Sequence, residues 1–115
     1  ALGDAHILRN AGGRVTEDMI RSLVISQQQL GTREVIVLHH TDCGAQTFEN
    51  ADFVADLEDR FQVDLQNQDF LPFKDVEESV RQDVALLKSS PLIPEDVTIF
   101  GAVYDVDTGR ISPVQ

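Results

Sequence analysis

The sequence predicts an α/β protein with a three-layer arrangement, in which a mainly parallel sheet is flanked by helices. Short runs of β-branched and apolar residues alternate along the chain with longer segments whose apolar residues recur at helical spacing. We expect strands at residues 5–9, 34–39 and 97–106, and helices near 17–30 and 74–88. The chain has 115 residues, enough for one hydrophobic core, so we expect a single domain over residues 1–115.

The first half of the chain predicts a strand, a helix and a second strand. Residues 5–9 are a short strand candidate that ends at a glycine-containing loop, residues 10–13. Thr16 is the expected N-cap of the helix, and Gly31 follows its last turn. Together with the run at 34–39, these elements predict a right-handed βαβ crossover with parallel strands.

The second half is rich in acidic residues. We expect a short amphipathic helix around residues 48–57, a loop at 61–72, a helix at 74–88, and a last strand followed by a turn and a brief returning strand at 110–114. A run of charge on a helix is usually a solvated face, and we interpret all the carboxylates of residues 45–85 in that way. They are Glu49, Asp52, Asp56, Glu58, Asp59, Asp64, Asp69, Asp75, Glu77, Glu78 and Asp83.

Composition excludes several partners. The formal net charge is -11, from 20 acidic and 9 basic side chains, and such a surface repels nucleic-acid backbones and anionic membranes. No apolar run approaches the roughly 20 residues that a membrane helix requires. One cysteine cannot form an internal disulfide, which fits a cytoplasmic location.

Chemistry-bearing residues follow the strand predicted at 34–39. Ligands of open α/β sheets lie beyond the carboxyl ends of the strands. His40 and Cys43 lie three residues apart there, so an imidazole nitrogen and a thiolate can meet at one point. Both are ligand types that zinc prefers. His39 should face the opposite side, because side chains alternate along a strand.

The motifs resemble the β-class carbonic anhydrases, particularly the small bacterial and archaeal members. Residues 9–12 read R-N-A-G and residues 40–44 read H-T-D-C-G, about 30 positions further on; residues 87–94 and 105–109 add to the likeness. The resemblance implies a Zn²⁺ held by Cys, His and Cys, whose bound water loses a proton near pH 7 and attacks carbon dioxide to give bicarbonate. By residue-level match, the resemblance implies that His40 and Cys43 are metal ligands and that Asn10, Ala11, Gly12 and Gly44 line the substrate pocket.

The chain departs from this family pattern at one point. The family's first zinc cysteine belongs to a C-x-D-x-R motif on an earlier strand, and this chain has neither that motif nor a second cysteine. We therefore expect the C-terminal portion of a β-carbonic anhydrase-like fold, which supplies two of three protein ligands. A sheet that lacks its first strand exposes an edge and apolar surface, so we also expect a homodimer or larger homo-oligomer.

Other functions stay open on the sequence alone. The same fold and metal could hydrolyse carbon disulfide or carbonyl sulfide. A degenerate family member without a working metal site could act as a non-catalytic dimerisation module. Cys43 could also serve as a covalent nucleophile, activated by His40 or by a helix N-terminus. Bound zinc, or a C-x-D-x-R segment upstream, would favour the enzyme.

Overall fold

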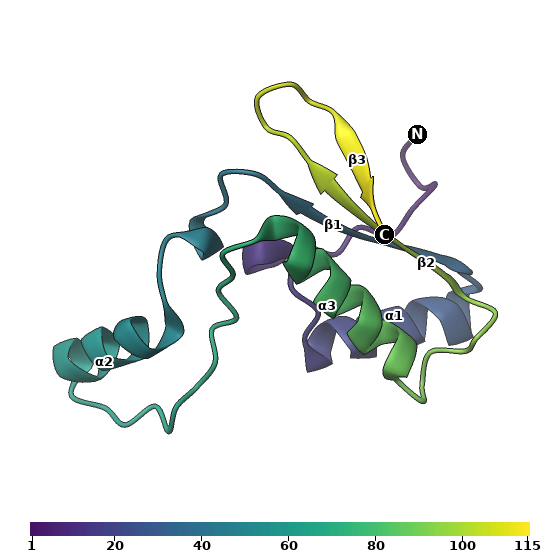
Figure 1. Cartoon of the computed structure of the whole chain (residues 1–115). Coiled ribbons are helices and arrows are strands. Elements are labelled where there is room, and N and C mark those ends of the chain that lie inside the picture. Colours follow the sequence, from purple (N-terminus) through teal and green to yellow (C-terminus); the bar gives the residue numbers. More distant parts are fainter.

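The computed structural model describes all residues 1–115, which form helices and a small sheet (Figure 1). Three α-helices and three strands are joined by two single-turn 3₁₀ helices. In chain order the elements are η1 (Ala11–Gly13), α1 (Glu17–Leu30), β1 (Glu34–His40), η2 (Gly44–Gln46), α2 (Asn50–Phe61), α3 (Val76–Ser89), β2 (Thr98–Tyr104) and β3 (Ile111–Val114).

The sheet has the order β1-β2-β3 and is mixed. β1 and β2 are parallel, with Val37 opposite Gly101, and they are connected through α2 and α3. β2 and β3 form an antiparallel hairpin, with Val103 opposite Ser112. β1 is therefore an edge strand, with one side of its backbone unpaired. The α/β class is confirmed, and so are the predicted strands at 34–39 and 97–106 within a few residues.

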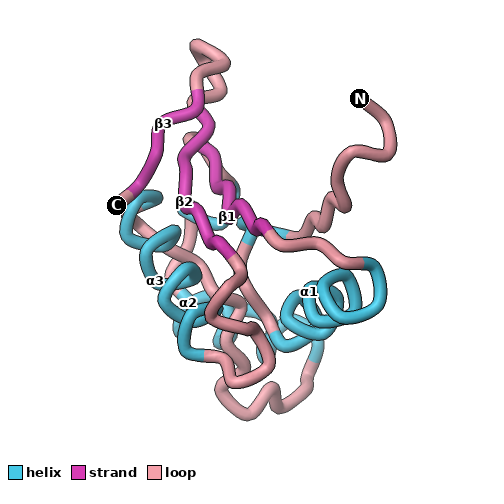
Figure 2. The backbone as a smooth tube through the Cα atoms, turned by 90° about the vertical axis from the view of Figure 1, so that its right-hand side faces the viewer, coloured by secondary structure: helices cyan, strands magenta, loops and turns pink.

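The helices α1 and α3 cover the same face of the sheet (Figures 1 and 2). Burial alternates along β1, so that Val35, Val37 and His39 face the helices. The local signals predicted these helices well: the Thr16 hydroxyl oxygen accepts a hydrogen bond from the Met19 N–H at 3.3 Å at the start of α1. The core lies between this face and the helices and comprises Val15, Val35, Val37, Val80, Leu87, Ile93, Val97 and Val103.

The opposite face of the sheet is open to solvent. Ile36 and Leu38 on β1 are 67% and 43% exposed, and Phe100 on β2 is 52% exposed. Tyr104 and Ile111 continue this apolar surface towards β3. Among residues 1–115, the third layer of the expected three-layer arrangement is thus not present, because no helix of this chain packs on that face.

The strand predicted at residues 5–9 is wrong. Residues 1–10 are all exposed, and the N-terminal end stands away from the body of the molecule (Figure 1). The His6 ring still reaches the Ser26 hydroxyl oxygen on α1, at 2.7 Å. A strand exists only where a neighbouring strand pairs with its backbone, and residues 5–9 make no backbone–backbone hydrogen bond. The expected βαβ crossover over residues 5–39 is therefore wrong too, and the parallel pair is β1 and β2.

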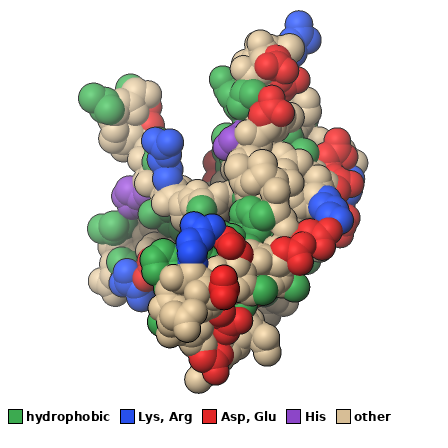
Figure 3. All heavy atoms as spheres, turned by 90° about the vertical axis from the view of Figure 1, so that its left-hand side faces the viewer, with side chains coloured by type: hydrophobic (Ala, Val, Ile, Leu, Met, Phe, Trp, Pro, Cys, Tyr) green, Lys and Arg blue, Asp and Glu red, His purple; other side chains and the backbone are tan.

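Residues 47–72 form a lobe that stands apart from the sheet (Figure 1). Its interior is aromatic: the Phe53 ring lies 4.7 Å from that of Phe48 and 5.0 Å from that of Phe70, measured between centroids. Acidic side chains gather on its surface (Figure 3). The two chain segments at its base are joined by a hydrogen bond of 3.0 Å from the Phe73 N–H to the Ala45 carbonyl. None of the helices has the length and apolar character needed to cross a bilayer.

Candidate functional site

His40 is the last residue of β1, and its imidazole is oriented by the backbone that follows. Its Nδ1 atom lies 2.6 Å from the Thr41 carbonyl oxygen. A carbonyl only accepts hydrogen bonds, so Nδ1 carries a proton and donates. In the neutral ring, Nε2 then presents its lone pair, which is the arrangement that a metal-binding histidine requires. His40 is exposed, whereas its neighbour His39 is buried, so the predicted alternation is confirmed.

Cys43 lies in the turn after β1 and is only 6% exposed. Its sulfur accepts a hydrogen bond from the Ala45 N–H at 3.4 Å, and its own N–H donates to Gln46 Oε1 at 3.3 Å. These reciprocal bonds form a capping box on η2. Asp42, just before it, adopts a left-handed backbone conformation with φ 50°. The position of the thiol is therefore set by the turn.

The predicted pocket residues lie beside this turn. η1, which follows Asn10, approaches η2 so closely that a Cβ atom on Gly12 would lie 3.1 Å from the Ala45 Cβ. The Asn10 side chain donates to the Arg14 carbonyl at 2.8 Å, which closes the loop around Ala11. A Cβ on Gly44 would meet no atom within 4 Å. The structure thus brings the 10–12 loop next to the Cys43 turn, although a substrate-binding role for it stays a prediction.

An open depression of about 250 Å³ lies on the exposed sheet face next to His40. Its lining is mainly apolar and includes Leu38, Tyr104 and Val106. Tyr104 pairs with His40 across β1 and β2. A small apolar molecule approaching over this face would therefore meet the His40 imidazole.

These donors fit zinc but do not complete a zinc site. Imidazole nitrogen and thiolate sulfur are the ligands that zinc prefers, and a structural or catalytic site needs three or four protein ligands. No cluster of three or more histidine, cysteine, aspartate or glutamate side chains in this chain could hold a metal ion. Residues 1–115 can therefore supply His40 and Cys43, and no third protein ligand.

Beneath this region lies a buried charged cluster that sequence reasoning missed. The Asp83 carboxylate, on α3, accepts hydrogen bonds from Arg14 Nε at 2.9 Å and Arg14 Nη2 at 3.1 Å. His39 Nε2 lies 3.2 Å from Asp83 Oδ2, and His39 Nδ1 lies 2.8 Å from the Ser79 hydroxyl oxygen. Phe73 stacks on His39, with 5.6 Å between ring centroids. We name these five residues, Arg14, His39, Phe73, Ser79 and Asp83, the Asp83 cluster.

The prediction that all the carboxylates of residues 45–85 are solvated is wrong for Asp83, which is only 2% exposed. Burial alone would raise its pKa, but hydrogen bonds from His39 and Arg14 and the Arg14 charge outweigh burial and lower it. The sequence held a signal for this position. Asp83 falls on the helix stripe of Val76, Val80 and Leu87, where an acid must be paired.

Comparison with known proteins agrees with these features. A family model for carbonic anhydrase matches residues 1–111. Beta-carbonic anhydrase 1 of Mycobacterium tuberculosis is 43% identical over 114 residues, which cover 97% of this chain and 68% of that protein. The chain belongs to the β-carbonic anhydrase family.

Two further proteins are similar to this chain. The crystal structure of a carbonic anhydrase from Streptococcus mutans superposes with a TM-score of 0.95 and 72% identity, and the match covers all of this chain and 69% of that one. A carbon disulfide hydrolase of Acidithiobacillus thiooxidans is 34% identical, over 96% of this chain and 64% of that protein. That match extends over 129 positions, more than the 115 residues of this chain, so the hydrolase has inserted residues that this β-carbonic anhydrase chain lacks.

Proposed function

We propose that this chain is part of a zinc-dependent lyase that interconverts carbon dioxide and bicarbonate, with His40 and Cys43 as two of the protein ligands. The observation that carries the proposal is the pair of donors at the end of β1, in a chain of the β-carbonic anhydrase family. Zinc, when bound, supplies a Lewis acid and a hydroxide at neutral pH. The third protein ligand comes from outside residues 1–115.

The chain's own residues orient the two proposed zinc ligands and shape the surface over which a substrate would reach them. The Thr41 carbonyl accepts from His40 Nδ1 and so leaves Nε2 available to a zinc ion, and the Ala45 N–H fixes the position of the Cys43 sulfur, which would be the second ligand. The apolar lining beside His40 suits an uncharged, non-polar molecule such as carbon dioxide. Gly44 leaves open space beside the turn, whereas Gly12 lets the 10–12 loop pack closely against Ala45. The predicted pocket of Asn10, Ala11, Gly12 and Gly44 would lie between these two segments.

Carbon disulfide is the second candidate substrate, since relatives are named carbon disulfide hydrolase. The higher identity to carbonic anhydrases favours carbon dioxide. Burial of Cys43 disfavours the covalent-nucleophile alternative, because a thiol that attacks substrate must be reached by it. The non-catalytic module remains as the outcome if no zinc binds.

We further propose that the protein is a homo-oligomer in the cytoplasm, a dimer or larger, with no nucleic-acid or membrane partner. The support is the unpaired edge of β1 and the apolar face formed by Ile36, Leu38 and Phe100. A contiguous apolar surface of this kind is usually covered by another protein surface.

The experiment is to measure carbon dioxide hydration and carbon disulfide hydrolysis by the zinc-loaded protein and by His40→Ala. Hydration should be lost in His40→Ala and retained in His6→Ala, whose exposed ring bonds the Ser26 hydroxyl instead. Hydration that survives in His40→Ala would contradict the proposal. Turnover of carbon disulfide without hydration of carbon dioxide would assign the second substrate.

A further inference from the structure

The Asp83 cluster lies where four segments of the chain meet. Arg14 follows η1, His39 precedes the candidate ligand His40 on β1, Ser79 and Asp83 belong to α3, and Phe73 ends the chain segment that returns from the α2 lobe. The Arg14 and Asp83 side chains are 8% and 3% exposed, so their ion pair is shielded from water. The cluster is thus a buried junction directly behind the candidate zinc site.

Hydrogen bonds from this junction reach β1, the loop before α1, α3 and the segment that returns from the α2 lobe. His39 Nε2 lies 2.9 Å from the Gly13 carbonyl oxygen and so ties β1 to the loop of predicted pocket residues. The Val15 N–H donates to Asp83 at 3.2 Å, which ties the same loop to α3. Arg14 Nη1 donates to the Leu71 carbonyl at 3.1 Å, and this bond holds a residue in the left-handed conformation with φ 59°. Such a conformation persists only when its surroundings impose it.

We propose that Asp83 is a positioning residue for zinc: through His39 and Arg14 it fixes the end of β1 and the 10–14 loop, and thereby the relative placement of His40 and Cys43. This inference rests on the proposed function. Asp83 itself does not touch the metal. Groups that hydrogen-bond a metal ligand set its orientation, and losing one typically weakens metal binding by about 10–100-fold. Asp83 acts one step further away, through His39 and Arg14.

The charge of Asp83 matters as well as its shape. Arg14 is always protonated, and a buried guanidinium without a counter-charge is strongly unfavourable. In an Asp83→Asn variant, Arg14 has to move towards water, and the adjoining loop moves with it. Ser79→Ala is milder, because it removes only the hydroxyl partner of His39 and leaves the ion pair intact.

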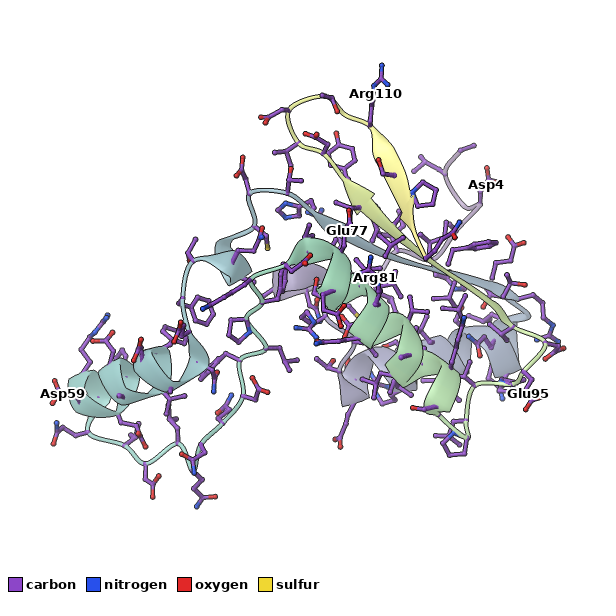
Figure 4. All side chains as sticks on the ribbon, in the orientation of Figure 1. Asp4, Asp59, Glu77, Arg81, Glu95 and Arg110 are labelled. Carbon is purple, nitrogen blue, oxygen red and sulfur yellow. The ribbon has the colours of Figure 1, made fainter.

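The test uses the protein completed by its third zinc ligand and compares zinc affinity in the wild type, Asp83→Asn, Ser79→Ala and a control, by competition with a chelator at neutral pH. The control is Glu77→Gln, which removes one carboxylate from the same helix but at an exposed ion pair with Arg81, at 3.2 Å (Figure 4). We expect the zinc dissociation constant of Asp83→Asn to rise about tenfold or more and that of Ser79→Ala to rise less. Glu77→Gln should match the wild type.

Thermal unfolding of the metal-free variants separates positioning from stability. A folded Asp83→Asn that binds zinc as tightly as the wild type would overturn the inference, since a purely structural role lowers the unfolding temperature alone. If Asp83→Asn does not fold, Ser79→Ala carries the test, and unchanged affinity there would equally overturn it. A wild type that takes up no zinc overturns the proposed function and this inference together. If the wild type and Asp83→Asn bind zinc equally tightly, only the inference is overturned.

Discussion

Arg14 and Asp83 are 69 positions apart in the chain and form a buried ion pair with an Nε–Oδ2 distance of 2.9 Å. The pair joins the loop before α1 to the middle of α3. A buried pair of this kind adds little compared with apolar packing, but breaking it by removing one partner costs about 3–5 kcal/mol. Its integrity therefore determines whether the region behind the candidate zinc site is well ordered.

Stability should fall in acid because of Asp83. Its pKa is lowered in the folded protein, chiefly by hydrogen bonds from His39 and Arg14 that outweigh the opposing effect of burial. A lowered folded-state pKa gives stability that is present above the unfolded value of about 3.9 and is lost as the pH falls through the folded value. Urea unfolding as a function of pH should show this loss in the wild type. Asp83→Asn should be less stable at neutral pH, and its free energy of unfolding should change less with pH in acid. An equally steep fall of the unfolding free energy would show that Asp83 is not the cause.

Gly13→Ala should be more destabilising than Gly31→Ala. Both glycines have positive φ, 67° and 78°, so each substitution carries a similar backbone strain of about 1 kcal/mol. A Cβ on Gly13 would also lie 2.8 Å from His39 Cδ2 and 2.9 Å from the Leu38 carbonyl oxygen, whereas one on Gly31 would meet nothing within 4 Å. Urea unfolding of the two variants should therefore differ by about 1–3 kcal/mol, the usual cost of overpacking. Equal stabilities would show that the loop moves freely away from His39.

Phe100→Glu should weaken self-association. Phe100 lies on the open sheet face opposite Ile36, and a charge there makes burial against a second copy unfavourable. Sedimentation velocity should show a shift towards monomer with little change in folding, since the side chain is exposed within this chain. Leu92→Glu, at a similarly exposed leucine in the loop after α3, is the control and should sediment as the wild type does. A wild type that is a stable monomer at micromolar concentration would contradict the proposed oligomer.

Local signals in the sequence predicted the helices and the alternation at the end of β1. Thr16 and Gly31 bound α1 as expected, because caps act through bonds within a few residues. His39 and His40 face opposite sides as the period of a strand requires. These features depend only on residues that are close together in the chain, so one sequence is enough to predict them.

Features that depend on distant partners were not predictable in the same way. Residues 5–9 have the composition of a strand, but composition does not reveal whether another strand pairs with them. Asp83 was grouped with solvated acids, although its place on the apolar stripe of α3 marked it as buried. Its partners Arg14 and His39 lie 69 and 44 positions away, and only the folded chain brings them together.

The account rests on zinc binding by His40 and Cys43, and elemental analysis of the purified protein measures it directly. In the protein completed by its third zinc ligand, we expect about one zinc ion per chain for the wild type and for His6→Ala, because a site of this kind holds a single ion. Zinc should be lost from both His40→Ala and Cys43→Ser, since removing either ligand leaves the ion with too few protein donors. Zinc retained at the wild-type ratio in these two variants would contradict the account.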